Sequence, residues 1–286
     1  MNKTQFKSMS PMERLVYWIS ERERIRIEKA RRESQEEFTL KPLTKCRVMS
    51  QYRFCNVVRM DDRVSQWLYN EWYYPNHNHK NMVPAIAMAR CFNKPSTLEA
   101  IGFPQRWNLK QWEKKLIDMK KTESVFNAAY IIRAENHEDK VTSVLFKYVK
   151  PLIDNPPDLD RSSMEACHAE IMGYHGFGSF MAGQIVADMR WAIGGTWLDR
   201  NDWAPMGPGS QRGMNRLVGN DVDDKWHQED WLEQLHETRY EAEKSIPRRL
   251  ARRMEMHDWQ NCLCEYDKFC RFYTGDGRPK QKWSMQ

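Results

Sequence analysis

The sequence is poor in the residue types that favour β-strands. Val, Ile and Thr are sparse beside Glu, Lys, Arg, Leu, Met and Ala, and Gly and Pro number 13 each in 286 residues. Straight-chain residues and Ala favour helices, whereas β-branched residues favour strands. This balance predicts a helical protein.

Long hydrophobic runs are also lacking. The first twelve residues are polar, and no apolar run approaches the roughly 20 residues that a membrane span needs. Cysteines number seven, an odd count that indicates free thiols in a reducing cytoplasm. We therefore expect a cytoplasmic protein without a membrane partner.

A complete set of metal-binding cysteines is missing as well. Cys262, Cys264 and Cys270 form a C-x-C-x5-C pattern without a fourth cysteine close by. A structural zinc or iron–sulfur site would need that fourth ligand. We expect no metal here and assign these thiols to the core and to helix faces.

Aromatic residues and positive charge are present instead. The chain has 12 Trp, 11 Tyr and 11 Phe, and 41% of its residues are hydrophobic, enough for a large packed core. The formal net charge is +6 and the pI is about 8.9. This charge is ordinary for a soluble protein and is also compatible with a polyanion such as nucleic acid.

Apolar periodicity predicts an all-α fold with short loops. We expect one bilobal domain over 1–286, with lobes over about 50–155 and 160–225 and the active cleft between them. The segments 10–45 and 226–273 are expected to pack together, and 274–286 to form a flexible tail. The expected helices are 11–33, 52–73, 81–93, 109–121, 124–134, 138–153, two within 161–191, one after the loop 194–217, 227–244 and 254–272.

The segment "YRFCNVVRMDD", 52–62, places an amide, a guanidinium and a carboxylate three residues apart. Asn56, Arg59 and Asp62 would share one face of a helix. Such a polar set is unusual for a stripe that faces a core, so we interpret it as a substrate or phosphate site.

The stretch "GYHGFGSFMAG", 173–183, has the pattern of a helix-hairpin-helix turn. Glycine permits φ > 0 and close approach, and backbone N–H groups at the start of the second helix can bind a DNA phosphate. Phe177 would anchor the turn, while Gly176, Gly178 and Ser179 would face the DNA. A plain helix–turn–helix connection with glycine caps is the alternative.

Two further segments carry candidate chemistry. The loop "MGPGSQRG", 206–213, offers Ser210 and Arg212 for a phosphate or carboxylate, although it lacks the spacing of a nucleotide P-loop. In "LCEYDKF", 263–269, Glu265, Asp267 and Lys268 lie among apolar residues, which predicts a partly buried Glu265–Lys268 ion pair. That pair could be structural or belong to an active site.

The hairpin and the segment after it resemble the helix-hairpin-helix DNA glycosylase fold, in which an aspartate comes about twenty residues after the hairpin. Asp199 and Asp202 are the matching positions, and we favour Asp202. The hairpin has no Lys of the kind that many glycosylases use as a nucleophile.

The chain as a whole resembles the phage α-glutamyl/putrescinyl thymine pyrophosphorylases, also described as amino acid:DNA transferases. It is similar as well to the helical domain associated with 5-hydroxymethyluracil DNA kinases. The motifs that carry the resemblance span most of the chain: "YRFCNVVRMDD", "NAAYIIR", "GFGSFMAGQIVADM", "GPGSQRG" and "QNCLCEYDK".

This resemblance implies an enzyme of the infected host's cytoplasm that acts on phage DNA. A (pyro)phosphate on 5-(phosphomethyl)uracil in double-stranded DNA would be replaced by the amine of a free amino acid or polyamine. The resemblance implies no redox cofactor and leaves the use of Mg²⁺ open. We expect a monomer. Base flipping would expose the target.

This chemistry assigns candidate roles to the residues. Arg59, Arg212 and Lys268 would meet the leaving phosphate, and Asp202, Glu265 or Asp267 would take a proton from the incoming ammonium. Two alternatives remain open at this point: a base-excision glycosylase, which would release free base, and a non-catalytic DNA-binding protein, which would leave the nucleosides unchanged.

Overall fold

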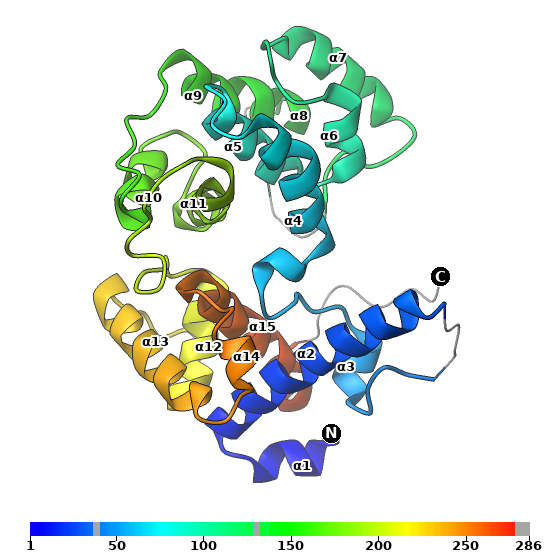
Figure 1. Ribbon diagram of the computed structural model, residues 1–286, viewed down its shortest axis with the longest axis vertical. Coiled ribbons are helices and arrows are strands. Elements are labelled where there is room, and N and C mark those ends of the chain that lie inside the picture. The colour runs from blue at the N-terminus through cyan, green and yellow to red at the C-terminus, as the bar shows by residue number, and fades with distance from the viewer. Residues whose placement is uncertain (37–40, 128–131, 136, 278–286) are drawn as a thin grey trace. The chain divides into compact units, whose positions relative to one another are not determined.

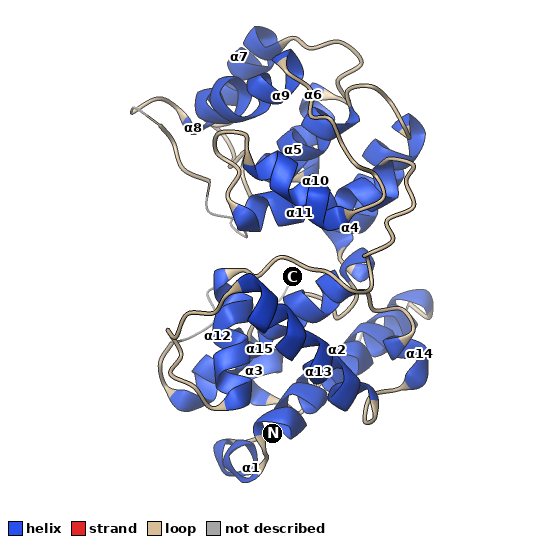
Figure 2. Cartoon of the chain, turned by 90° about the vertical axis from the view of Figure 1, so that its left-hand side faces the viewer, coloured by secondary structure: helices blue, strands red, loops and turns tan. Residues whose placement is uncertain are grey.

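The computed structural model describes residues 1–36, 41–127, 132–135 and 137–277. Every regular element over these residues is a helix, and no strand occurs among them (Figures 1 and 2). The expected all-α class is confirmed. The helix-hairpin-helix glycosylase-like fold remains a prediction.

The chain divides into two compact units. Unit 1 comprises Met1–Asp62 and Asn201–Gln286, and unit 2 comprises Arg63–Arg200. These divisions fall at 62/63 and 200/201, whereas the sequence suggested lobes over 50–155 and 160–225. The polar segment 52–62 therefore belongs with the two chain ends, not with the residues after it.

Unit 1 is a bundle around the long helices near the two chain ends. Its core is rich in aromatic side chains, including the fully buried Trp18, Trp231, Trp259 and Tyr266. The helices are α1 Lys3–Ser8, α2 Pro11–Ser34, α3 Arg47–Gln51, the short 3₁₀ turn η1 Arg59–Asp61, α12 Pro208–Val218, α13 Gln228–Glu243, α14 Arg248–Ala251 and α15 Met256–Thr274.

Local chemistry explains the start of α2. Ser10 Oγ accepts from the Glu13 N–H at 3.2 Å, and the Ser10 N–H donates to Glu13 at 2.6 Å. Pro11 occupies the first helical position, where its missing N–H costs no hydrogen bond. This capping box sets the register that buries Leu15, Trp18 and Ile19. The sequence prediction for this helix is confirmed.

Helices α12 and α15 approach each other closely because α12 carries glycines. A Cβ on Gly213 would lie 2.1 Å from the Leu263 carbonyl oxygen, and one on Gly209 would lie 3.1 Å from Cys264 Sγ. No larger residue fits at Gly213 without moving backbone. Gly209 and Gly213 of "GPGSQRG" thus serve helix packing.

Unit 2 contains the remaining helices. They are α4 Arg63–Trp67, the π-helical η2 Leu68–Tyr73, the 3₁₀ turn η3 Tyr74–Asn76, α5 Met82–Phe92, α6 Pro95–Ile101, α7 Leu109–Met119, α8 Lys140–Thr142, the π-helical η4 Ser143–Val149, α9 Lys150–Asp154, α10 Met164–Met172 and α11 Ser179–Ala192.

A buried ion pair joins α5 to α11 in this unit. Arg90 and Asp188 are 2% and 0% exposed, and Arg90 Nη2 donates to Asp188 at 2.7 Å. Tyr73 at the end of η2 donates to the same carboxylate at 2.6 Å. Burial of a charged pair requires such full hydrogen bonding, so removal of one partner would be strongly destabilising.

Two helix predictions were wrong. Residues 124–127 and 132–134 are not helical, and 128–131 lie outside the described residues. Within 52–73, helix begins only at Arg59, and the irregular segment 53–58 links α3 to η1. The predictions for 81–93, 109–121 and 138–153 are confirmed within a few residues.

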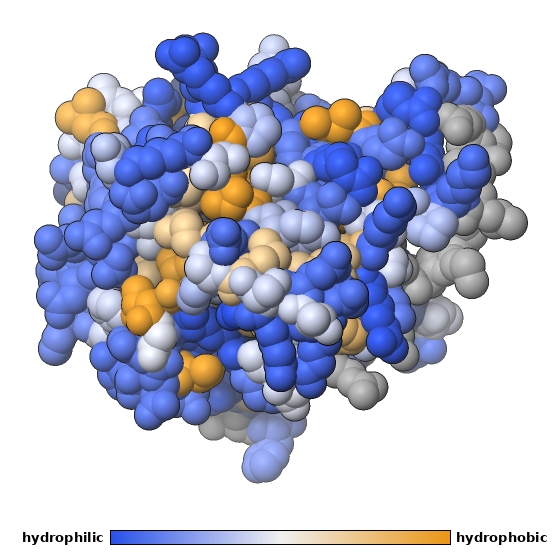
Figure 3. All heavy atoms as spheres, turned by 90° about the horizontal axis from the view of Figure 1, so that it is seen from below, coloured by the Kyte–Doolittle hydropathy of each residue, from blue (hydrophilic) through white to orange (hydrophobic). Residues whose placement is uncertain are grey.

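Figure 3 presents the face seen from below in Figure 1. Its hydrophobic side chains are interspersed with hydrophilic ones and form no broad continuous surface. Such scattered apolar residues are normal on a soluble protein. This face therefore gives no indication of an apolar docking surface.

Candidate functional site

A polar cluster lies where the segment 54–62 runs between α2 and α15 in unit 1. We call it the Asp62 cluster, and it consists of Arg22, Asn56, Asp62, Glu265 and Lys268. Consecutive backbone groups organise it: the Cys55 N–H donates to Glu265 at 3.0 Å, and the Asn56 N–H donates to Asp62 at 2.9 Å. Two carboxylates are thereby fixed on neighbouring residues of one segment.

Asn56 and Asp62 meet even though the expected helix is absent. The short turn η1 brings the chain back, so that Asn56 Nδ2 also donates to the Asp61 carbonyl at 2.7 Å. Asn56 is 8% exposed, and its Oδ1 atom has no hydrogen-bond partner among the described residues. A buried acceptor without a donor is costly, so this atom has the capacity to accept a further hydrogen bond.

Asp62 has the most unusual carboxyl chemistry of the cluster. Burial raises its pKa to about 6, although the hydrogen bond from Asn56 and the charge of Arg22 lower it. Glu265 adds to the rise through like-charge repulsion. A carboxyl group with such a pKa can exchange a proton near neutral pH.

Glu265 and Lys268 form the ion pair that the sequence predicted. Lys268 Nζ lies 3.1 Å from Glu265 Oε2, with side chains 21% and 10% exposed. Burial lowers the pKa of Lys268, but Glu265 and Cys55 outweigh it and the pKa rises. Lys268 also lies 4.7 Å above the Phe54 ring. It is therefore a fixed cation at neutral pH.

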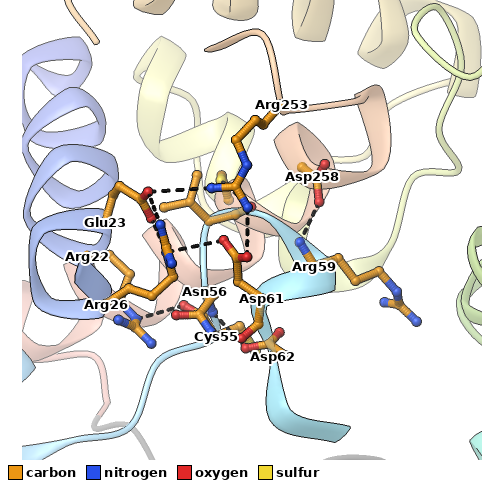
Figure 4. A network of polar contacts seen from close by, with 12 residues as sticks. Arg22, Glu23, Arg26, Cys55, Asn56, Arg59, Asp61, Asp62, Arg253 and Asp258 are labelled. Atoms are coloured by element: carbon orange, nitrogen blue, oxygen red, sulfur yellow. Dashed lines mark hydrogen bonds and ion pairs between the residues drawn. The ribbon is translucent and has the colours of Figure 1, made fainter. Parts of the chain in front are cut away.

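Asp61, next to Asp62, points into a different network (Figure 4). Arg253 donates to Asp61 at 2.7 Å and Arg26 lies 3.2 Å from it, while both arginines also pair with Glu23. These ion pairs connect α2, η1 and the segment before α15. Consecutive aspartates thus have separate surroundings: Asp61 lies among cations, and the half-buried Asp62 accepts from the Asn56 N–H.

Arg59 contributes its backbone to this region. Its N–H donates to Asp258 Oδ1 at 2.7 Å, and the other Asp258 oxygen accepts from the Glu255 N–H at 2.9 Å. In Figure 4 the Arg59 guanidinium points away from Asp258 and from Asn56. The shared helix face expected for Asn56, Arg59 and Asp62 does not form.

Arg212 and Asp267 lie together, on the α12–α15 interface. Asp267 is fully buried and is contacted by Arg212 at 3.2 Å, Arg216 at 2.7 Å and Arg271 at 3.3 Å. Three guanidinium groups therefore satisfy this buried carboxylate with ion pairs. The local geometry supports a structural role for Asp267.

Ser210 is occupied by its own helix end. Its hydroxyl hydrogen-bonds with both backbone groups of Gly207 at 3.0 Å, and Gln260 donates to it at 3.3 Å. The side chain is fully buried. Ser210 therefore caps α12 and couples it to α15.

The expected hairpin connects α10 to α11 in unit 2. Phe177 is 2% exposed and packs near Tyr148, with ring centroids 6.3 Å apart. Gly176 has φ +86°, and a Cβ there would lie 2.1 Å from the Tyr148 ring. Gly178 has φ −72°, so of the two glycines of the turn only Gly176 has the expected positive φ. A Cβ at Gly178 would have no atom within 4 Å.

Gly178 and Ser179 form the start of α11. Gly178 is the N-cap residue and Ser179 the first helical residue. Ser179 contributes its carbonyl, which lies 2.9 Å from His168 Nε2. Beside the turn, a pocket of about 320 Å³ is lined by Arg133, Glu135, Tyr148 and Gly176, among others.

Asp199 and Asp202 have different surroundings. Asp199 accepts from the Met164 N–H at 2.7 Å, the Glu165 N–H at 3.0 Å and Ser163 Oγ at 2.8 Å, so it caps α10. Asp202 is exposed, and its carbonyl lies 2.8 Å from His236 Nε2. The two lie in different units, since the division falls between them.

Sequence reasoning missed Arg22 as part of the cluster. Arg22 Nε donates to the Cys55 carbonyl at 3.0 Å and to the Phe54 carbonyl at 3.3 Å. Arg22 lies on the apolar stripe of α2, between Ile19 and Ile25. This position in the sequence already indicates a buried arginine, and a buried arginine needs a hydrogen-bonding partner.

The described residues contain no group of three or more His, Cys, Asp or Glu side chains that could hold a metal ion. All seven cysteines are free thiols. Over the same part of the chain, no helix has the length and apolarity needed to cross a membrane.

Comparison with known protein families gives a match over most of the chain. No curated protein and no solved structure is similar enough to match the chain. The family described as "5-hmdU DNA kinase, helical domain" matches residues 10–278, which is nearly the whole sequence. The relation to this domain expected from the sequence is confirmed: the chain belongs to the family of the 5-hmdU DNA kinase helical domain, and its role lies in the metabolism of DNA with modified pyrimidines.

Proposed function

We propose that this protein is a DNA-modifying transferase. It replaces the phosphate or pyrophosphate on 5-(phosphomethyl)uracil in DNA with the amine of an amino acid or polyamine. The family supports the modified-uracil part of the proposal, because its name refers to a kinase that acts on 5-hmdU DNA. A phosphorylated methylene group is the product of such a kinase and the substrate of such a transferase.

The observation that carries the proposal is the Asp62 cluster. An incoming amine arrives as an ammonium ion and must lose a proton before it can attack. The cluster offers a carboxyl group whose pKa is raised to about 6 and a buried amide oxygen, Asn56 Oδ1, without a donor. Ammonium N–H groups would satisfy both acceptors.

The proposed reaction is a nucleophilic substitution at the methylene carbon, and its protons and electron pairs balance. The ammonium gives one proton to Asp62, and the free nitrogen lone pair attacks the methylene carbon of the modified base. The carbon–oxygen bond breaks, and its electron pair leaves on the phosphate oxygen. The product is a secondary amine that first carries a proton as a secondary ammonium ion.

Glu265 and Lys268 fit supporting roles in this reaction. Glu265 holds Lys268 in place, and Lys268 supplies fixed positive charge beside the cluster. A departing phosphate is stabilised by such a preorganised cation. Arg59 and Arg212 remain candidates for the same anion, and Asp199 and Asp202 remain candidates from the glycosylase resemblance, although the cap role of Asp199 favours Asp202 of the two.

The proposed DNA contacts are at the hairpin of unit 2. Gly176, Phe177, Gly178 and Ser179 would present the start of α11 to a backbone phosphate of double-stranded DNA. Gly178 has the open space that close approach requires. The target base would be flipped out of the duplex, as is common for enzymes that do chemistry on a base.

The experiment is nucleoside analysis by mass spectrometry. DNA with phosphorylated 5-hydroxymethyluracil is incubated with the protein and a mixture of amino acids and polyamines, with and without Mg²⁺, and then digested. A nucleoside that has gained an amine supports the transferase and identifies the amine. Free base with abasic DNA would indicate a glycosylase, and unchanged nucleosides with DNA affinity would indicate a binding protein.

A further inference from the structure

Leu198 is the most exposed large hydrophobic side chain among the described residues, at 74%. A single exposed leucine is common on protein surfaces and alone indicates nothing. What distinguishes Leu198 is the backbone that carries it, which is fixed on both sides.

Residues 196–199 are hydrogen-bonded, one after another, to residues 161–165 of the same unit. The Arg161 carbonyl accepts from the Thr196 N–H at 3.0 Å, and the Ser162 carbonyl accepts from the Leu198 N–H at 2.7 Å. Asp199 then caps α10 through three hydrogen bonds. The loop tip therefore cannot turn Leu198 inward without loss of this ladder.

The residue before Leu198 has an unusual conformation. Trp197 has φ +46°, although it is not glycine, and its side chain is 4% exposed. Its ring lies against Gly195, where a Cβ would be 2.8 Å from the indole and 2.6 Å from the Arg161 carbonyl. Left-handed backbone in a bulky residue is strained and persists only when the surroundings enforce it. Here the buried ring enforces it, and Leu198 is directed into solvent.

Two exposed arginines lie on the backbone segments that hold this tip: Arg161, whose carbonyl accepts from the Thr196 N–H, and Arg200, two residues after Leu198. Arg161 and Arg200 are both exposed, and Arg161 Nη1 lies 3.5 Å from the Gly194 carbonyl of the same loop. The nearest carboxylate in sequence, Asp199, is occupied by the cap of α10. An exposed apolar tip on a segment that also carries exposed arginines is complementary to DNA, where phosphates flank a stack of apolar base faces.

We propose that Leu198 inserts into the base stack of duplex DNA at the target nucleotide and occupies the space that the flipped base leaves. Arg161 and Arg200 contact the phosphates on either side. The apolar side chain replaces the stacking partner that the neighbouring bases lose, which lowers the free energy of the flipped state. This inference rests on the proposed function in one respect, namely that the protein acts on a base in DNA.

The test uses the full chain and a duplex with one phosphorylated 5-hydroxymethyluracil beside 2-aminopurine. The 2-aminopurine fluorescence rises when its neighbour leaves the stack. We expect wild type to raise the fluorescence and Leu198→Ala to lose most of that rise, with DNA affinity within about twofold because phosphate contacts dominate affinity. Product formation on this duplex should fall about tenfold, which corresponds to about 1.4 kcal/mol.

A second duplex separates base flipping from other defects. There the target faces an abasic site and is already poorly stacked, so Leu198→Ala should regain nearly the wild-type rate. Leu198→Met should retain the wild-type behaviour on both duplexes, because it keeps a long apolar side chain. Val218→Ala, which shortens another exposed apolar residue at 39% exposure, serves as the control and should change nothing.

The outcomes distinguish the inference from the proposed function. If wild type binds DNA and raises the fluorescence, and Leu198→Ala does the same, the insertion of Leu198 is wrong whatever the reaction is. An equal loss of rate on both duplexes also overturns it. If wild type does not bind DNA, the proposed function fails, and this inference fails with it.

Discussion

Asp62 and Glu265 are held by the N–H groups of two consecutive residues, Asn56 and Cys55, at 2.9 and 3.0 Å. Their surroundings nevertheless differ. Glu265 is ion-paired with Lys268, whereas burial raises the pKa of Asp62 to about 6. Neighbouring carboxyl groups with such different environments are typical of sites where one exchanges a proton and the other supplies charge.

The first prediction concerns Asp62→Asn and turnover. Asn keeps the shape and can still accept from the Asn56 N–H, but it cannot take a proton. Turnover should fall by about 10² to 10⁴, the usual contribution of general acid–base catalysis, while DNA affinity is retained. Amine transfer rates and fluorescence anisotropy measure the two quantities. Asp61→Asn is the matched control, because Asp61 pairs with Arg26 and Arg253 and should affect turnover little.

The second prediction concerns pH. A transfer that needs ionised Asp62 should lose rate as the pH falls through about 6, the raised pKa of this group. Stability should respond in the opposite sense. Because the folded-state pKa lies above the ordinary value of 3.8, the stability that protonation provides is present below 3.8 and lost as the pH rises through 6.

Asp62→Asn should therefore be more stable than wild type at neutral pH, with a free energy of unfolding that is higher by at most about 3 kcal/mol. This difference in the free energy of unfolding should shrink as the pH falls. Thermal unfolding of both proteins over this pH range measures it. A wild-type protein that is more stable than Asp62→Asn at neutral pH would contradict the raised pKa assigned to Asp62.

The third prediction separates Asp199 from Asp202. Asp199→Ala removes the cap of α10 and should destabilise the protein by about 1–2 kcal/mol. Asp202→Asn changes an exposed side chain and should leave stability unchanged, so any loss of turnover there is chemical. Denaturant unfolding and amine transfer rates together assign each residue. A stable Asp199→Ala protein without activity would make Asp199 the catalytic aspartate.

The fourth prediction uses the two hairpin glycines. Gly176→Ala should destabilise unit 2, because the residue has φ +86° and its Cβ would overlap the Tyr148 ring. Gly178→Val should fold normally, since φ is −72° and nothing lies within 4 Å of its Cβ. It should still weaken DNA binding, because the new side chain blocks the approach of a phosphate. Unchanged DNA affinity in folded Gly178→Val would remove the hairpin from the DNA interface.

The fifth prediction concerns Arg212 and Asp267. Asp267→Asn leaves three arginines around a neutral group and should destabilise the protein by about 3–5 kcal/mol. Arg212→Lys keeps the charge and should cost far less. If Arg212 binds the leaving phosphate, this variant slows transfer even at saturating amine. A higher KM for the amine alone would instead assign Arg212 to the amino acid carboxylate.

Local signals in the sequence were sufficient for many helices. The capping box at Ser10 and Glu13 and the apolar stripe of α2 act within a few residues, so they can be recognised without a structure. The glycine hairpin was recognised for the same reason. Residues 124–127 and 132–134 were mistaken for parts of a buried helix, because a short apolar run does not by itself specify a helix.

The candidate site could be predicted only in part. Asn56 and Asp62 were identified, but for a helical reason that does not hold, since they meet through the turn η1. The contacts of Arg22 with the cluster depend on which face of α2 is buried. The different surroundings of Glu265 and Asp267 depend likewise on which faces of α15 are buried. Those faces are set by tertiary packing around α15, which residue spacing alone does not encode.

The central claim is that an amine replaces a phosphate on a base in DNA, with Asp62 as the proton acceptor. The most direct measurement incubates phosphorylated 5-hydroxymethyluracil DNA with ¹⁵N-labelled amine and quantifies both labelled nucleoside and released (pyro)phosphate. The account predicts equal amounts of the two products with wild type and almost none of either with Asp62→Asn. Phosphate release without ¹⁵N in the DNA, free base, or full activity of Asp62→Asn would contradict it.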